Sequence, residues 1–212
     1  MKKFNKNIII VMFLLAAFIF FSVKSYAETV NKDLSESLFR LHVIANSDSE
    51  EDQNLKYKVR DSLLNYMNTL SINSKSKDET INIALLHLDE FEQIAEDTIR
   101  QNGYDYPVEV EIGNYSFPTK SYGDISLPSG YYDALRVKIG KANGHNWWCV
   151  MFPPLCFVDV TSATVPEESK DQLKQSLSNE EYDIISQNSE TSEVKFKIVE
   201  LFNSLASKLA QK

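Results

Sequence analysis

The spacing of apolar residues changes at Pro107, and this change limits the folds that the chain can adopt. Before Pro107, apolar residues recur every three or four positions over 50–70 and again over 81–102, which predicts two consecutive amphipathic helices. After it, apolar and acidic residues alternate over 108–112, which predicts a strand with one solvated face. Helices segregated in this way from a set of strands favour an α+β fold over a doubly wound sheet.

A buried strand is predicted to precede the first helix. The run over 38–45 is β-branched and aromatic, and it ends in the polar segment 46–49. Ser49, followed three residues later by Asp52, resembles a capping box, which marks the start of a helix. The sequence before Pro107 therefore indicates one strand followed by two helices.

Strands are expected to fill the middle of the chain. The pair Gly113-Asn114 predicts a tight turn within a β-hairpin, and runs over 134–139 and 147–152 form a second pair of strands. We therefore expect a single α+β domain, with an antiparallel sheet of about five strands and helices packed on one side. Its expected parts are a strand and two helices over about 38–102, a β-rich region over about 107–160, and C-terminal helices over about 166–211, the last near 194–209.

The N-terminus has the pattern of a signal peptide. Three lysines precede an apolar run over 8–21, and Ser25 and Ala27 supply the small side chains that signal peptidase requires. This pattern predicts cleavage between Ala27 and Glu28, which leaves a mature domain over 28–212. The apolar run is shorter than the roughly 20 residues that cross a bilayer as a helix, so an uncleaved membrane anchor is the alternative.

The charge of the chain argues against several classes of partner. The sequence has 30 acidic and 22 basic residues, for a net charge of −8, and removal of residues 1–27 takes away four lysines and no acidic residue, which gives −12. Nonspecific binding to nucleic acid or anionic lipid requires a positive field. We therefore expect no nucleic-acid partner, and contact with a membrane only through an uncleaved signal peptide.

The cysteines Cys149 and Cys156 form an even pair in a chain with an export signal, where a disulfide bond is the default expectation. If residues 151–154 form a loop, Val150 faces Leu155, and the two cysteines face each other at a Cα separation of about 4.5 to 5.5 Å. That separation permits a disulfide bond. We therefore predict a disulfide between Cys149 and Cys156.

Two chemical alternatives use the same region. Cys149 could act as a nucleophile with His145 as its base, which would make the chain an extracytoplasmic hydrolase. Histidine and cysteine side chains could also bind a metal, but their spacing matches no metal-binding motif. The sequence contains no phosphate-binding loop and no hydrolase nucleophile elbow. We therefore expect no enzymatic activity, no metal and no cofactor.

Aromatic residues and prolines concentrate between residues 115 and 157. Most of the aromatic rings are expected in the core, but the adjacent Trp147 and Trp148 point to opposite faces of a strand, which allows one of them to be exposed. Exposed aromatic side chains beside a rigid loop are typical of protein-recognition surfaces. The candidate interaction residues are Tyr131, Tyr132, His145, Asn146, Trp147, Trp148, Phe152, Pro153, Pro154 and Phe157.

Two blocks of sequence carry a specific resemblance. One lies within 38–61, and the other lies within 132–157, where Trp-Trp-Cys is combined with Pro-Pro-Leu-Cys. Together they resemble the stage II sporulation protein R family of endospore-forming Firmicutes, over about residues 36–160. The motif residues that carry the resemblance and are candidates for recognition or for the fold are Arg40, His42, Asn46, Asp48, Arg60, Asp133 and Arg136.

The resemblance implies a signalling protein that is secreted from the forespore into the space between the forespore and mother-cell membranes. There it would activate the membrane-embedded aspartic protease of the mother cell, which processes pro-sigma factor E. The family has no catalytic residues to transfer to this chain. A cell-wall-binding module is a further alternative, because such modules also use exposed tryptophan and tyrosine side chains.

Overall fold

The structure is a computed structural model that describes residues 6–71, 74–156 and 165–186. The predicted strand residues 158 and 160, the predicted helix over 194–209 and Phe157 lie outside the described residues. The helices are α1 (Lys6–Ser37), α2 (Glu50–Ser71), α3 (Lys77–Leu86), α4 (Leu88–Gln101), α5 (Glu167–Ser176) and α6 (Asn179–Ser186). The strands are β1 (Phe39–Ile44), β2 (Val108–Phe117), β3 (Lys120–Tyr122), β4 (Ile125–Leu127), β5 (Gly130–Ile139) and β6 (Asn146–Phe152).

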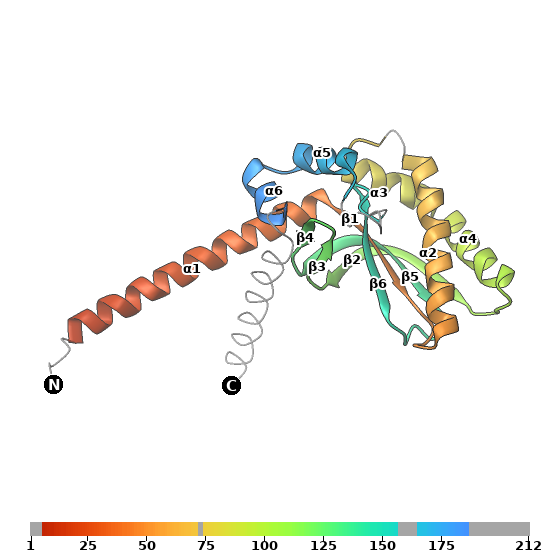
Figure 1. The fold of residues 1–212 in the computed structure, drawn as a ribbon, viewed down its shortest axis with the longest axis horizontal. Coiled ribbons are helices and arrows are strands. Elements are labelled where there is room, and N and C mark those ends of the chain that lie inside the picture. Colours follow the sequence, from red (N-terminus) through yellow and green to blue (C-terminus); the bar gives the residue numbers. More distant parts are fainter. Residues whose placement is uncertain (1–5, 72–73, 157–164, 187–212) are drawn as a thin grey trace.

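The main sheet has the strand order β2-β5-β1-β6, and β3 and β4 form a separate antiparallel pair (Figure 1). Strand β5 is antiparallel to β2, and β6 is antiparallel to β1, whereas β1 and β5 are parallel. A parallel pair needs a long crossover, and the helices α2 to α4 provide part of it. The α+β class and the mostly antiparallel sheet are confirmed, with four strands in the main sheet rather than about five.

The predicted pairing of the strands over 134–139 and 147–152 is wrong, because β1 lies between β5 and β6. Residues 39–43 of β1 are buried. A buried strand must satisfy its backbone donors and acceptors on both edges, so β1 takes a neighbouring strand on each side. The connection 140–145 passes the end of β1 and joins β5 to β6, the two strands on either side of it.

The tight turn predicted at Gly113-Asn114 is also absent. Strand β2 runs through both residues, and Gly113 and Asn114 pair with Ala134 and Asp133 of β5. The ring of Tyr115 lies where a Cβ of Gly113 would be, with Oη 2.7 Å from that position. Glycine here makes room for an aromatic side chain rather than a turn.

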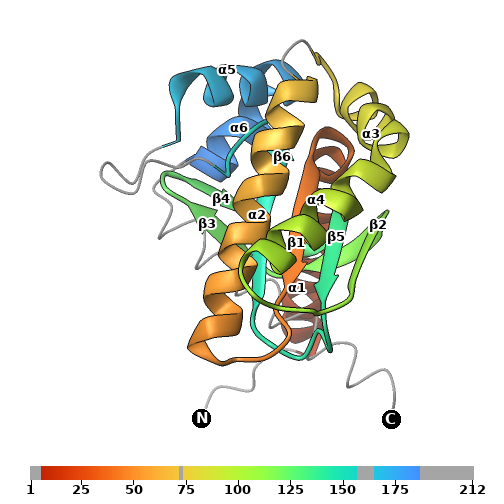
Figure 2. The same ribbon diagram turned by 90° about the vertical axis from the view of Figure 1, so that its right-hand side faces the viewer.

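Helices cover both faces of the sheet rather than one side. On one face, α2 and α4 pack on Phe39, Leu41 and Val43 of β1, and Figure 2 shows α2, α3 and α4 in front of the sheet. The other face is covered by the C-terminal end of α1, the β3–β4 hairpin, α5 and α6. The core is therefore divided into two clusters, one on each face of the sheet, because side chains on both faces of β1 are buried.

The helix expected over 81–102 is two helices, α3 and α4, which meet at His87. His87 has φ −115° and ψ 23°, and its N–H donates to Ala84 O, which ends α3. The ring Nδ1 lies 3.1 Å from Tyr66 Oη on α2. The break lets α3 and α4 take different directions along α2.

Among the side chains of α1 that the structure describes, those at the C-terminal end reach the core. Leu34 and Leu38, at and just beyond that end, are fully buried. The large apolar side chains described between Ile8 and Phe21 are 50% to 72% exposed, and Figure 1 shows this part of α1 projecting from the domain. Within the described ranges, no helix combines the length and apolar character needed to cross a membrane. The predicted cleavage site after Ala27 lies within α1, upstream of the residues that pack.

Candidate functional site

The disulfide loop at the end of β6 has the geometry expected from the sequence. Cys149 and Cys156 are bonded, with a Cα separation of 5.3 Å. Leu155 N–H donates to Val150 O at 3.1 Å, so these two residues face each other inside the bonded pair. The four residues between them therefore form a short loop that is closed covalently and by a backbone hydrogen bond.

The disulfide bond removes the nucleophile of the hydrolase alternative. Cys149 is 1% exposed and has no free thiol. His145, the base in that alternative, instead lies with its ring Nδ1 2.5 Å from Asp48 Oδ1. Within the described parts of the chain, no group of three or more His, Cys, Asp or Glu side chains is arranged to hold a metal ion.

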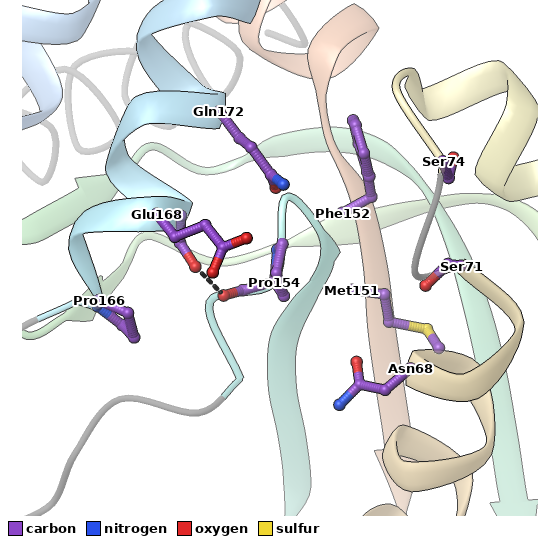
Figure 3. A pocket seen from close by; sticks show the side chains of 10 residues that line it. Asn68, Ser71, Ser74, Met151, Phe152, Pro154, Pro166, Glu168 and Gln172 are labelled. Carbon is purple, nitrogen blue, oxygen red and sulfur yellow. Dashed lines mark hydrogen bonds between the residues drawn. The ribbon is translucent and has the colours of Figure 1, made fainter.

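A pocket of about 340 Å³ lies beside the disulfide loop, between α2 and α5 (Figure 3). Figure 3 shows Glu168 and Gln172 extending from α5 toward the loop. Ser169 Oγ donates to Pro154 O at 2.7 Å, which ties α5 to the loop. The lining side chains are Asn68, Ser71 and Ser74 from α2 and the segment after it, Met151, Phe152 and Pro154 from the disulfide loop, and Pro166, Glu168, Ser169 and Gln172 from the α5 region.

Arg40 is fully buried on the opposite face of β1 from Leu41. Its Cζ lies 4.1 Å from the ring centroid of Phe117 and 4.7 Å from that of Tyr132, which gives cation–π contacts. Nη2 donates to Tyr122 Oη at 2.6 Å, and this hydroxyl donates to Trp148 O at 3.1 Å. Arg40 thus connects β1 to the β3–β4 hairpin directly and to the backbone of β6 through Tyr122.

His42 lies two residues further along the same face of β1. Its ring stacks on Trp148 with centroids 3.7 Å apart, and Nε2 lies 2.8 Å from Asn146 Oδ1. Burial lowers the pKa of His42 to about 4, and the nearby cations Arg136 and Arg40 act in the same direction. The imidazole is therefore neutral at physiological pH and belongs to the packed face under β6.

The low pKa of His42 predicts a loss of stability in acid. In the unfolded chain the imidazole binds a proton below pH 6.5, whereas in the folded chain it does so only near pH 4. As the pH falls, the unfolded state therefore binds the proton first. The free energy of unfolding should decrease by about 2 kcal/mol from pH 8 to pH 5 because of His42. Urea unfolding of wild type and His42→Gln across this range tests it. A difference between the two proteins that does not change with pH would contradict the assignment.

Two motif residues join the loop before α2 to the loop between β5 and β6. Asn46 Oδ1 accepts from Lys141 N at 2.9 Å, and Asp48 Oδ1 accepts from His145 N at 2.6 Å. Asn46 Nδ2 also donates to Asp52 Oδ2 at 2.7 Å. Because Asp52 turns to this loop, it does not complete the predicted capping box, although its N–H does donate to Ser49 Oγ at 3.2 Å.

The remaining motif residues form contacts within the domain. The Arg60 Cζ lies 4.2 Å from the Trp147 ring centroid. Asp133 pairs with Lys77 at 2.6 Å. Arg136 pairs with Glu111 at 2.6 Å and lies over the ring of Tyr115 at 3.8 Å. These contacts give each motif residue a role in holding the fold.

The candidate interaction residues are divided between the two ends of the sheet. Trp147 packs toward α2 and Trp148 toward the other face, as predicted, and both rings are half-buried. His145 and Asn146 are exposed at the end of the sheet where Ile44 pairs with Asn146. At the other end, Tyr131 is 68% exposed, whereas Tyr132, Phe152 and Pro153 are buried and Pro154 is half-buried.

Several residues of this region were not indicated by the sequence. Glu168 and Gln172 line the pocket, but nothing in the chain between residues 157 and 165 indicates that α5 returns to the disulfide loop. Lys56 is 1% exposed, donates to Gln53 Oε1 at 2.5 Å and to His145 O at 3.1 Å, and burial lowers its pKa. The sequence signal that could have indicated burial of Lys56 is its position next to Leu55, which belongs to the apolar stripe of the predicted helix.

Comparison with known proteins identifies the family. A family model described as stage II sporulation protein R matches residues 35–162. Stage II sporulation protein R of Bacillus subtilis (strain 168) is 36% identical over 139 residues, which cover 66% of this chain and 62% of the relative. The match thus spans less than two thirds of that relative. No solved structure matches the chain. On this match, which includes every strand of the main sheet and the disulfide loop, the chain belongs to the stage II sporulation protein R family.

Proposed function

We propose that the chain is an exported signalling protein of sporulation that activates the membrane-embedded aspartic protease processing pro-sigma factor E. The family match over residues 35–162 carries this proposal. The N-terminal lysines, the apolar run and the small residues before Glu28 support secretion across the forespore membrane, into the space between the two membranes. The disulfide bond also supports export, because disulfide bonds form and persist in the oxidising environment outside the cytoplasm.

The proposed mode of action is binding rather than chemistry. A protein ligand that binds the active state of the protease more tightly than the resting state shifts the equilibrium toward the active state. The disulfide loop, the covalently closed end of β6, offers a rigid surface for such binding. Rigid surfaces lose little conformational entropy when they dock.

Reconstitution in a non-sporulating bacterial host tests the proposal. The full chain is co-expressed with the protease and with pro-sigma factor E, and processing of the precursor is followed by immunoblot. We expect processing only when the chain is exported, and a variant without residues 1–27, which is retained in the cytoplasm, should be inactive. Equal processing with and without the chain would refute the proposed activity.

Tyr131 is an exposed aromatic residue of the candidate surface, and we expect Tyr131→Ala to lower processing several-fold. With 68% of the side chain exposed, the change should alter the free energy of unfolding by less than about 0.5 kcal/mol. Leu86→Ala is the matched control, because Leu86 is 81% exposed and lies on α3. Equal processing by the two variants would remove Tyr131 from the contact surface.

A further inference from the structure

The pocket beside the disulfide loop combines apolar side chains with polar groups from two helices. Met151, Phe152 and Pro154 supply apolar surface from the loop, and α5 supplies Glu168 and Gln172 (Figure 3). Its volume of about 340 Å³ is sufficient for part of a ligand or a side chain of a partner. The hydrogen-bonding groups around it decide what kind of group fits.

Two of the three serine hydroxyls that line the pocket, those of Ser71 and Ser169, already use their protons within the chain. Ser71 Oγ donates to Met67 O at 2.8 Å, and Ser169 Oγ donates to Pro154 O at 2.7 Å. A hydroxyl group has one proton and two acceptor lone pairs. Both hydroxyls can therefore offer a ligand only acceptor capacity.

Two further acceptors on α5 lack a donor. Gln172 Oε1 is buried and has no hydrogen-bond partner among the residues that the structure describes. The Glu168 carboxylate has no ion pair with any residue that the structure describes, and the α5 lysines Lys170 and Lys174 pair with other carboxylates. Lys170, the nearest basic residue along α5, is held by Asp124 at 2.7 Å and by Glu167 at 2.9 Å. The Glu168 side chain is exposed, so the cost of a buried acceptor without a donor falls on Gln172 Oε1, and a ligand with donors would recover it.

A cation with several donors and an apolar stem complements these groups. Lysine and arginine side chains carry only donors at their charged ends, and their methylene stems pack well on apolar surface. The net charge of −8 also favours approach of a basic partner segment. We propose that this pocket receives a lysine or arginine side chain of the protein partner. The identity of that partner rests on the proposed function, whereas the chemistry of the pocket does not.

Titration with small probes tests the pocket directly. The ¹⁵N-labelled exported protein is titrated with Nα-acetyl-arginine methylamide and Nα-acetyl-lysine methylamide, and with Nα-acetyl-norleucine methylamide as the uncharged control. The basic probes should shift the side-chain amide signals of Gln172 and Asn68 saturably, and Glu168→Gln should weaken this binding about fivefold. Absence of saturation with the basic probes, or an equal response to norleucine, would overturn the proposal.

The processing assay tests the same pocket in signalling. Glu168→Gln should reduce processing about fivefold, whereas Glu180→Gln, which removes the same charge from the first turn of α6, should not. Equal urea midpoints of the two variants show that folding is not the cause. Unchanged processing by Glu168→Gln overturns docking of the partner here. If the wild-type chain itself promotes no processing, the proposed function fails, and the probe titration alone decides the pocket.

Discussion

Gly144→Ala is expected to lower the free energy of unfolding by about 3 kcal/mol, measured by urea denaturation. A Cβ at Gly144 would collide with the carbonyl oxygen of Ser47, a backbone atom that cannot turn away. Gly144 N–H also donates to Ala45 O at 2.9 Å, which holds the two loops together. The collision therefore separates the segment before α2 from the connection between β5 and β6.

Gly103→Ala is the control for this effect. Gly103 has φ +83°, and a Cβ there would meet no atom within 4 Å. Its replacement should cost only the backbone strain of the left-handed conformation, about 1 to 2 kcal/mol. A smaller loss for Gly144→Ala than for Gly103→Ala would show that the two loops can move apart at little cost.

Cys149→Ser is expected to lower the free energy of unfolding by about 4 kcal/mol. Closing the short loop to Cys156 contributes about 2.5 kcal/mol in the chain-entropy model. The new hydroxyl would lie at a site that is 1% exposed, which adds about 1 to 2 kcal/mol. Urea denaturation measures the loss, and processing should fall as well, because the loop supplies Met151, Phe152 and Pro154 to the pocket.

Cys156→Ser separates the two contributions, because Cys156 is half-buried. We expect it to lose only about 2.5 kcal/mol, and wild type treated with dithiothreitol should lose a similar amount. The double serine variant should not respond to dithiothreitol. A free, alkylatable Cys149 in the exported protein, with wild-type stability of Cys156→Ser, would disprove the disulfide bond.

Local pattern was sufficient for most elements of the fold. Helical spacing placed α2 over nearly its full length, and the β-branched run over 38–45 predicted β1. The cysteine spacing predicted the disulfide loop, because seven residues along the chain leave few geometries for the bond. These features depend on residues that are close together in the sequence. Apolar periodicity predicts such helices and strands, and the geometry of a short loop limits how its ends can meet.

The same local reasoning placed a turn at Gly113-Asn114, where β2 in fact continues. Glycine and asparagine are typical of hairpin turns, but pairing with Ala134 and Asp133 of β5 keeps both residues extended. The space that Gly113 leaves is filled by Tyr115. The hydrogen bonds between β2 and β5 and the packing of the Tyr115 ring outweigh the local preference of Gly-Asn for a turn.

The sequence alone was enough to assign the α+β class, the disulfide pair and the resemblance to a sporulation family. It also predicts an export signal. The tertiary structure was needed to place β1 between β5 and β6, to bring Arg40 to Tyr122, and to bring α5 to the disulfide loop. The reason is physical: strand order and pockets depend on contacts between residues far apart in the chain. Apolar periodicity shows that a face is buried, but it does not show which distant segment covers that face.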